Sequence, residues 1–395
     1  MHEGEGKPLP GGGDSAWSRD APIRAATIRE RFPIEQLVAS LPPRRATAIA
    51  YHGENMKLPL ALGFAATLLA QTWAPQNSNT RASLRGVSAV DARFVWASGS
   101  GGTYLATTDG GMTWRAAKVP GAETLDFRGI RAIDARTVYL MSAGSGDKSR
   151  IYETTDAGEH WTLLYTNADP KGFFDAIAFW DARHGIVVGD QLDGRAEILT
   201  TDDGGATWQR RNPPAALPNE GSFAASNSCL TLFGKQDAWF ATGGPGAARV
   251  FHSKDRGRTW TVTTTPMRND GASAGIFSLA FRDALHGIAV GGDYSKDKED
   301  RQNIALTSDG GRTWSAPPGP GLSPRGFRSA VAYVGYRKLW IVVTGTSGSD
   351  ISNGSGRTWR LFDSGAYNAM SFATAVDGWA VGPQGRIARF QPPNQ

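Results

Sequence analysis

The octapeptide Thr107-Thr-Asp-Gly-Gly-Met-Thr-Trp114 decides the fold, because close copies of it recur along the chain. The shared pattern is Ser or Thr, any residue, Asp, any residue, Gly, any residue, Thr or His, and Trp. Further copies occupy residues 154–161, 201–208, 253–260 and 307–314, and a worn copy at 352–359 has Gly354 in place of Asp. The final tryptophans are 47, 47, 52, 54 and 45 residues apart. This spacing indicates one supersecondary unit that is repeated.

Each octapeptide is typical of a tight turn between two strands. Glycine tolerates a positive φ, the Asp carboxylate accepts hydrogen bonds from N–H groups of the turn, and Trp begins the next strand as an apolar anchor. These roles are structural, so we assign the octapeptides to the fold and not to a catalytic site. The residues concerned are Asp109, Trp114, Asp156, Trp161, Asp203, Trp208, Asp255, Trp260, Asp309 and Trp314.

The octapeptide resembles the Asp box, also called the BNR repeat. That repeat is found in sialidases, sortilin-like receptors, xyloglucanases and photosystem II assembly factors. The well-preserved copies make the resemblance specific for the repeat class, but they do not select one function among these families.

Composition places the chain in the all-β class. Its 395 residues are 40% apolar, which allows a large core, and 49 glycines and 22 prolines indicate many turns. Short strand-like segments dominate over helical periodicity. The net charge of +5 is mild, but most cations are arginines, which favour fixed contacts with carboxylates or phosphates. Cys229 is the single cysteine, so an internal disulfide is excluded, and the six scattered histidines form no metal-binding pattern.

The first 74 residues differ from the repeats. Residues 1–55 are at first rich in Gly and Pro and contain no octapeptide, so we interpret them as a mis-assigned or disordered extension. A short basic start and the apolar run 58–70 follow, and this run is too short for a membrane span of about 20 residues. We interpret residues 56–74 as a secretory signal peptide.

Cleavage of this signal could follow Ala70 or Ala74, and Ala70 is favoured because Pro75 follows the other position. The interpretation makes Met56 the natural start of the protein. The alternative is a genuine start at Met1, with an internal apolar anchor.

A second pattern, Asp followed by Ala or Gly and a strand-like segment, precedes the octapeptides and gives the number of units. Counting one weaker copy, it occurs seven times. Residues 75–395 then divide into units of about 46 residues, the size of a four-stranded propeller blade. We therefore predict that residues 75–395 form a single seven-bladed β-propeller, with six or eight blades as alternatives.

The octapeptide is expected to join the third strand of a blade to the fourth. The last unit supplies only three strands, so we expect residues around 75–82 to add the fourth and to close the ring by pairing the two ends of the repeat region. The strands of the first unit are expected near 84–90, 94–98, 103–107 and 113–119.

Together the two patterns resemble the photosystem II stability and assembly factor family over roughly residues 80–392. Residues 107–114 and 377–382 carry the resemblance best. It implies a seven-bladed propeller, periplasmic, lumenal or secreted, that acts as an assembly scaffold. It also implies a protein partner held on an Arg-bearing face. With the arginines described below, we expect a protein partner or anionic ligand in the cell envelope, and we expect no cofactor.

Arginines gather on the face that carries the longer loops, where binding groups on a rigid scaffold are expected. Arg128 and Arg328 each follow a Phe at the start of a first strand, so we expect them at equivalent places near the channel mouth. A ring of arginines would attract an anionic ligand or an acidic protein surface, and ordinary surface charge is the alternative. Four more stand just before the third strand of their blade: Arg150, Arg195, Arg249 and Arg386.

A glycoside hydrolase is the first alternative function, because sialidases also carry the Asp box. An arginine cluster, a Tyr–Glu nucleophile pair and an acid could come from residues on the loop face. The Arg-Ile-Pro signature of sialidases is absent from the repeats, however, and xyloglucanases need two propellers where this chain holds one. The residues concerned are Arg128, Arg328, Tyr367, Glu220 and Asp175.

A structural repeat protein of the envelope is the second alternative. We expect a monomer without a metal or a nucleic-acid partner, and without a membrane span once the signal is removed.

Overall fold

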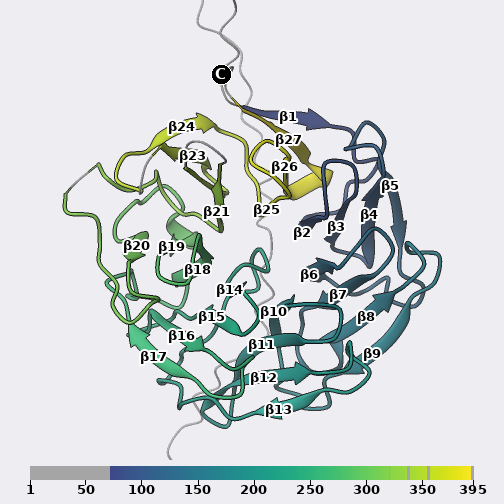
Figure 1. The fold of residues 1–395 in the computed structure, drawn as a ribbon, viewed down its shortest axis with the longest axis horizontal. Helices are drawn as coiled ribbons and strands as arrows, with labels where there is room; N and C mark the ends of the chain where they lie inside the picture. Colours follow the sequence, from purple (N-terminus) through teal and green to yellow (C-terminus); the bar gives the residue numbers. More distant parts are fainter. Residues whose placement is uncertain (1–71, 320, 336–338, 354–355, 393–395) are drawn as a thin grey trace, which may run out of the picture. The chain divides into compact units, whose positions relative to one another are not determined.

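A computed structural model describes residues 72–319, 321–335, 339–353 and 356–392. Within them the chain forms seven antiparallel sheets that follow one another around a ring (Figure 1). The predicted seven-bladed β-propeller is therefore confirmed. The extension 1–55, the signal peptide as far as residue 71, and positions 354–355 of the worn octapeptide lie outside the described residues. No helix in the described part of the chain is long and apolar enough to cross a membrane.

The strands of a blade follow one another in sequence from the centre of the ring to its rim (Figure 1). Blade 1 comprises β2 (Leu84–Ala89), β3 (Val95–Gly99), β4 (Thr103–Thr107) and β5 (Arg115–Lys118). Blade 2 comprises β6 (Phe127–Ala132), β7 (Val138–Ser142), β8 (Arg150–Thr154) and β9 (Thr162–Thr166). Blade 3 comprises β10 (Phe174–Phe179), β11 (Gly185–Leu192), β12 (Arg195–Thr201) and β13 (Gln209–Arg211).

Blades 4 to 6 continue the same order. Blade 4 comprises β14 (Leu230–Phe233), β15 (Asp237–Ala241), β16 (Arg249–Ser253) and β17 (Thr261–Thr264). Blade 5 comprises β18 (Ala274–Phe281), β19 (Gly287–Asp293) and β20 (Ile304–Thr307), and a single bridge between Leu306 and Ser315 takes the place of a fourth strand in the described chain. Blade 6 comprises β21 (Ala330–Val334), β22 (Trp340–Gly345), β23 (Gly348–Asn353) and β24 (Arg360–Asp363). Short 3-10 helices are η1 (Gly146–Lys148), η2 (Tyr294–Lys296) and η3 (Pro383–Gly385).

Blade 7 joins the two ends of the ring. It comprises β25 (Ala369–Phe372), β26 (Gly378–Val381), β27 (Ile387–Gln391) and, as its outer strand, β1 (Thr72–Gln76). The predicted closure is therefore present, but the closing strand begins three residues before the expected boundary at Pro75. Trp73 gives the physical reason, because its side chain is buried among Phe362, Tyr367 and Phe390 at centroid distances of 6.0, 5.7 and 5.4 Å.

The octapeptides of blades 1 to 4 form the predicted turn between the third and fourth strands. In blade 1 the Thr107 hydroxyl donates to the Asp109 carboxylate (2.7 Å) and accepts from the Gly111 N–H (2.9 Å). Asp109 also accepts from the N–H and the hydroxyl of Thr113, at 2.9 and 2.6 Å. Gly111 has a φ of 87°, which explains the glycine at this position. Trp114 belongs to the turn, so the fourth strand begins one residue after it.

The apolar core lies between neighbouring blades. Trp379 of blade 7 packs in one cluster with Leu84 and Leu105 of blade 1. Trp239 of blade 4 packs in another with Ile276 and Ala305 of blade 5. Because each blade is covered by its two neighbours, the stability of every blade depends on a closed ring.

Removal of β1 tests this dependence. A chain that begins at Gln71 keeps the closing strand, whereas a chain that begins at Pro75 loses Thr72, Trp73 and Ala74. We expect the shorter chain to unfold at a lower temperature, because loss of a buried Trp side chain costs roughly 3–5 kcal/mol. The measurement is thermal unfolding followed by circular dichroism. Trp73→Ala in the full chain should reproduce most of the loss, and equal melting temperatures for the three chains would contradict the prediction.

The octapeptide carboxylates predict a loss of stability in acid. Hydrogen bonds from Thr207 and Thr201 lower the pKa of Asp203 from 3.8 to about 2. A folded-state pKa below the unfolded value stabilises the fold above the unfolded pKa, and this stability is lost as the pH falls through about 2. We expect Asp203→Asn to melt lower than the wild type at neutral pH and to depend less on pH between about 4 and 2. Asp193→Asn, an exposed loop position, is the control, and identical pH profiles for all three proteins would exclude this role.

Candidate functional site

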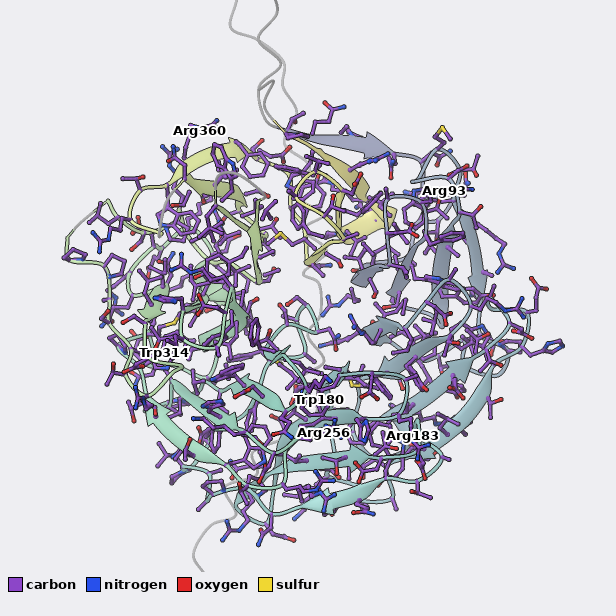
Figure 2. All side chains as sticks on the ribbon, in the orientation of Figure 1. Arg93, Trp180, Arg183, Arg256, Trp314 and Arg360 are labelled. Carbon is purple, nitrogen blue, oxygen red and sulfur yellow. The ribbon has the colours of Figure 1, made fainter. Side chains whose placement is uncertain are left out.

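Three candidate arginines begin the third strands of consecutive blades. Arg150 begins β8, Arg195 begins β12 and Arg249 begins β16. Arg386 immediately precedes β27, the third strand of blade 7. All four stand on the loop face, opposite the octapeptide turns, because each follows the loop that joins the second strand to the third. Arginine is not confined to these positions, since Arg93, Arg183 and Arg256 lie elsewhere around the ring (Figure 2).

Arg150 and Arg386 keep part of their guanidinium surface in solvent. Arg150 donates from Nε to the carbonyl of Asp147 (2.5 Å), lies 3.6 Å from its carboxylate, and retains 26% exposure of its side chain. Arg386 is exposed, donates to the carbonyl of Ala366 (3.2 Å) and lies 5.7 Å from the centre of the Tyr367 ring. These contacts fix the two guanidinium groups in place and leave donors free for a further acceptor.

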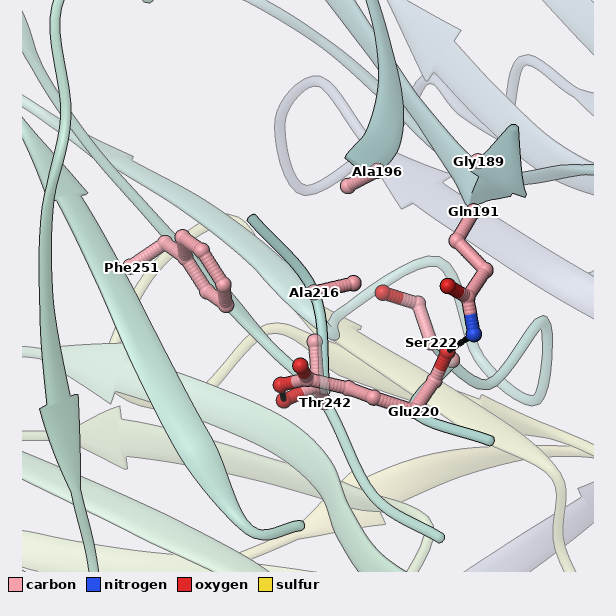
Figure 3. A pocket seen from close by; sticks show the side chains of 9 residues that line it. Gly189, Gln191, Ala196, Ala216, Glu220, Ser222, Thr242 and Phe251 are labelled. Atoms are coloured by element: carbon pink, nitrogen blue, oxygen red, sulfur yellow. Dashed lines mark hydrogen bonds between the residues drawn. The ribbon is translucent and has the colours of Figure 1, made fainter. Parts of the chain in front are cut away.

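Arg249 instead forms a buried ion pair with Glu220. Its Nε donates to Oε1 of Glu220 at 2.9 Å and its Nη2 contacts Oε2. Oε1 also accepts from the Thr242 hydroxyl at 2.6 Å, and Oε2 from the Leu217 N–H at 2.7 Å. The Glu220 side chain is 1% exposed and that of Arg249 is 11% exposed. Figure 3 shows Glu220 beside Thr242, with Gln191 close by, in the wall of a small pocket.

Arg249 and two other candidate arginines hold the 212–229 loop, which links β13 to β14. Arg195 donates to the carbonyl of Pro213, and Arg249 donates from Nη2 to that of Ala215 at 3.0 Å. Arg128 donates to the carbonyl of Ala224 at 3.4 Å. The structure therefore assigns these three arginines an intramolecular partner that sequence reasoning did not identify.

The 212–229 loop reaches toward the centre of the ring before β14 (Figure 1). Asn227 bonds to the backbone of Ile177 in blade 3, donating at 3.0 Å and accepting at 2.8 Å. Ser226 donates to the carbonyl of Ser329 next to blade 6 at 2.7 Å, and the hydroxyl of Ser228 lies 2.7 Å from that of Ser278 in blade 5. The loop thus links blades that are not neighbours.

Arg128 and Arg328 do not occupy equivalent places, so that prediction is wrong. Arg128 lies at a bulge between Phe127 and Gly129 of β6. The N–H of Arg328 donates to the Gly291 carbonyl of the preceding blade at 3.0 Å, as the N–H of Leu84 does to Gly382. Arg328 therefore matches the apolar residue one position before the bulge. The shared Phe-Arg dipeptide is out of register by one residue in the two blades.

Arg328 is also no binding residue. It is 0% exposed and paired with Asp350, which is itself 0% exposed. Further bonds from Nη1 to the carbonyl of Phe327 and to the Ser347 hydroxyl, both 2.8 Å, complete its contacts. The physical reason is that this side chain is buried against β23 of its own blade, where a charge persists only with a buried partner.

Arg85 is a further cation on the first strand of a blade, which sequence reasoning missed. It lies at the bulge of β2, the place that Arg128 holds in β6 and Asp175 in β10. The signal in the sequence is Arg-Gly after the first strand residue, present at both Arg85 and Arg128. Burial and the charge of Arg128 lower the pKa of Arg85 to about 10, and its buried Nε has no hydrogen-bond partner among the described residues.

The residues proposed for a sialidase-like centre have other partners. Glu220 is bound by Arg249, Arg328 is buried with Asp350, and Tyr367 packs against Trp73. The required nucleophile pair of Tyr367 and Glu220 is therefore not assembled. In the described part of the chain, no group of three or more His, Cys, Asp or Glu residues could hold a metal ion.

A larger cleft, of about 300 Å³, lies on the octapeptide face between blades 1 and 2. Trp96, Arg115 and Glu159 are among the residues that line it. Arg115 is paired with Glu159 at 3.3 Å and donates to the carbonyl of Ala157 at 2.7 Å. Arg115, the arginine that lines this cleft, is thus already paired within the protein. The cleft also lies on the face opposite the candidate arginines.

Comparison with known proteins supports the predicted resemblance. Residues 169–317 match the family model described as Photosynthesis system II assembly factor YCF48. Photosystem II assembly lipoprotein Ycf48 of Synechococcus sp. (strain CC9902) is 32% identical over 187 residues, which cover 47% of this chain and 48% of that protein. The chain therefore spans about half the length of this curated relative. The chain resembles the photosystem II assembly factor family.

Solved structures share the propeller fold. The structure described as YCF48 bound to D1 peptide gives a TM-score of 0.59 at 16% identity, covering 81% of this chain and 97% of that chain. YCF48 from Cyanidioschyzon merolae gives 0.56 at 16% identity, covering 82% and 99%. At these identities the likeness shows the fold alone.

The buried Asp175 predicts that the thermal stability of the fold depends on pH. Burial, reinforced by the charge of Asp190, raises the pKa of Asp175 well above its usual range. A raised pKa means that the folded state holds the proton more tightly than the unfolded state does. The protonated Asp175 therefore contributes its full stability to the fold at low pH, and this stability is lost as the pH rises. We expect Asp175→Asn to melt higher than the wild type at about pH 9, with the difference shrinking toward about pH 4.

The measurement for Asp175 is thermal unfolding across this pH range. Asp300→Asn, an exposed loop position, is the control. A destabilised Asp175→Asn protein with an unchanged pH profile would show that the ionised carboxylate is needed in the fold, contrary to the prediction.

Proposed function

We propose that this propeller is a scaffold protein that binds an acidic segment of another protein through its loop face, in the manner of an assembly factor. The observation that carries the proposal is the row of Arg150, Arg195 and Arg249 at matching positions of three consecutive blades. Matching positions on a rigid ring set the spacing of the cations, as recognition of an extended charged segment requires.

The local contacts of these arginines support binding rather than a purely structural role. Arg150 and Arg195 retain exposed surface, and each donates to a backbone carbonyl. Arg150 also lies 3.6 Å from the carboxylate of Asp147, whose side chain is largely exposed. A guanidinium held in this way can donate to a carboxylate with little loss of side-chain freedom. Arg386 against Tyr367 offers a similar group in blade 7.

The relatives support a protein as the partner. The matched family is described as an assembly factor, and one propeller of this fold is described as bound to a D1 peptide. The matched residues 169–317 include Arg195, Arg249 and the 212–229 loop. By analogy with these proteins, we propose that the ligand of this chain is a peptide segment of a protein that is being assembled.

An exported protein fits this function, and we propose a location outside the cytoplasm. The apolar run 58–70 is typical of a signal peptide, and the curated relative is described as a lipoprotein. Cleavage after Ala70 would leave β1 whole, whereas cleavage after Ala74 would remove Trp73 from the ring.

The proposal is tested by affinity capture with the full chain from an envelope extract of the source organism. Arg150→Glu/Arg195→Glu reverses two charges on the loop face. The matched control, Arg183→Glu/Arg312→Glu, reverses two exposed charges at turns of the octapeptide face. We expect a partner that is retained by the wild type and the control, is lost in the loop-face variant, and weakens as salt approaches about 0.15 M and above.

Identification of the captured protein by mass spectrometry completes the test. Equal capture by both double variants would show that the loop-face arginines do not carry recognition.

A further inference from the structure

The carboxylate of Glu220 lies in a site built from donors of blade 4 and from its own loop. Thr242, directly after β15, and Arg249, at the start of β16, supply three hydrogen bonds. The Leu217 N–H supplies the fourth from within the loop. We name the group of Arg249 and Thr242 the carboxylate cradle. Its donors belong to the rigid blade, while the group that fills it belongs to a connecting loop.

The same part of the loop also covers Arg195. The carbonyl of Pro213 accepts from Arg195, and that of Ala215 from Arg249. Residues 213–220 thus occupy two of the three arginines to which the proposed function assigns the partner. An internal peptide with one carboxylate and two carbonyl acceptors takes the place that an acidic peptide would need.

We propose that the carboxylate cradle is a binding site for an Asp or Glu side chain of the partner, and that Glu220 fills it in the unbound protein. This inference rests on the proposed function, and it identifies the binding element and its regulation. An incoming carboxylate displaces Glu220, and residues 213–220 swing away to uncover Arg195.

The exchange conserves the charge pairing of the buried site. One carboxylate replaces another, so Arg249 and Thr242 remain bonded and no buried cation is left alone, which would be costly. The displaced Glu220 moves into water, where an ionised carboxylate is well solvated. Besides the Leu217 bond, the exchange gives up the bonds from Arg195 and Arg249 to the carbonyls of Pro213 and Ala215. It also gives up the bond that the Gln191 side chain donates to the Glu220 carbonyl at 2.9 Å.

The structure also defines which part of the loop can move. Gly221 and Gly243 exchange two backbone hydrogen bonds, of 3.1 and 2.8 Å, directly after Glu220. Beyond that point Ser226 and Asn227 bond to other blades, so the central part of the loop is anchored. On the near side Leu217, Pro218 and Asn219 are exposed. The movement also breaks the bridge between Arg195 and Ala215 and the bond from the Ala216 N–H to the Gly194 carbonyl at 2.8 Å, both at the edge of blade 3.

The first experiment measures binding of a short glutamate-rich peptide with a blocked C-terminus to the full chain by isothermal titration calorimetry. Glu220→Gln weakens the internal competitor and keeps its shape. Glu299→Gln is the matched control, because Glu299 pairs with Arg268 at 2.8 Å elsewhere on the loop face and its loss changes net charge equally. We expect Glu220→Gln to bind at least about tenfold tighter than the wild type, and Glu299→Gln to match the wild type.

Arg249→Gln introduced into Glu220→Gln should remove this gain. The glutamine-rich version of the peptide should not bind any of the proteins, because the cradle recognises a charge.

A second experiment needs no variant and remains informative if Glu220→Gln folds poorly. Hydrogen exchange of the wild type is measured with and without the glutamate-rich peptide. We expect residues 213–220 to lose protection when the peptide binds, while residues 222–228 keep theirs.

The outcomes separate the two proposals. Peptide binding that is lost in Arg150→Glu/Arg195→Glu, but is unaffected by Glu220→Gln and leaves protection of 213–220 unchanged, supports the proposed function and overturns the displacement of Glu220. Equal gains in Glu220→Gln and Glu299→Gln also overturn it, because net charge alone then explains the effect. No binding in any protein overturns both proposals.

Discussion

The pairing of β1 with β27 is the constraint on which the rest of the structure depends. A blade has two apolar faces and cannot cover them itself, so its core exists only between neighbours, as in the clusters around Trp379 and Trp239. The five residues of β1, at the start of the described chain, pair with β27 and complete the sheet of blade 7. Trp73 adds side-chain contacts to these backbone bonds, since it packs in an aromatic cluster between blades 6 and 7 and donates from Nε1 to Ser349 at 3.0 Å.

A closed ring fixes the positions of equivalent residues, and this turns a sequence repeat into a spatial array. The inner strands are joined by hydroxyl groups: Ser371 accepts the N–H of Ala89, and Ser88 that of Ala132, both at 3.1 Å. The third strands carry arginines at one level of the loop face. The 212–229 loop reaches toward the centre of the ring and bonds several blades, and the proposed binding arginines lie beside it.

The arginine positions show how far sequence reasoning reached. Arg150, Arg195 and Arg249 could be placed because a repeat gives each residue a strand and a register. Arg328 was misplaced because a shift of one residue in register moves its side chain from the predicted channel mouth to a buried position, where Asp350 of the same blade pairs with it. Glu220 was considered as part of a possible nucleophile pair. Its actual partner, Arg249, lies 29 positions away in the sequence, and no local sequence pattern predicts this ion pair.

The amino-acid sequence by itself determined the all-β class, the number of blades, the turn made by each octapeptide and the face on which the arginines stand. These properties follow from local chemistry: a turn needs Gly and Asp at fixed positions, and strands alternate between turns of fixed spacing. Only the tertiary structure decided which charges are available. Burial, the one-residue register at each bulge, and the path of the 212–229 loop depend on residues far apart in the chain, and their contacts exist only once the ring has closed.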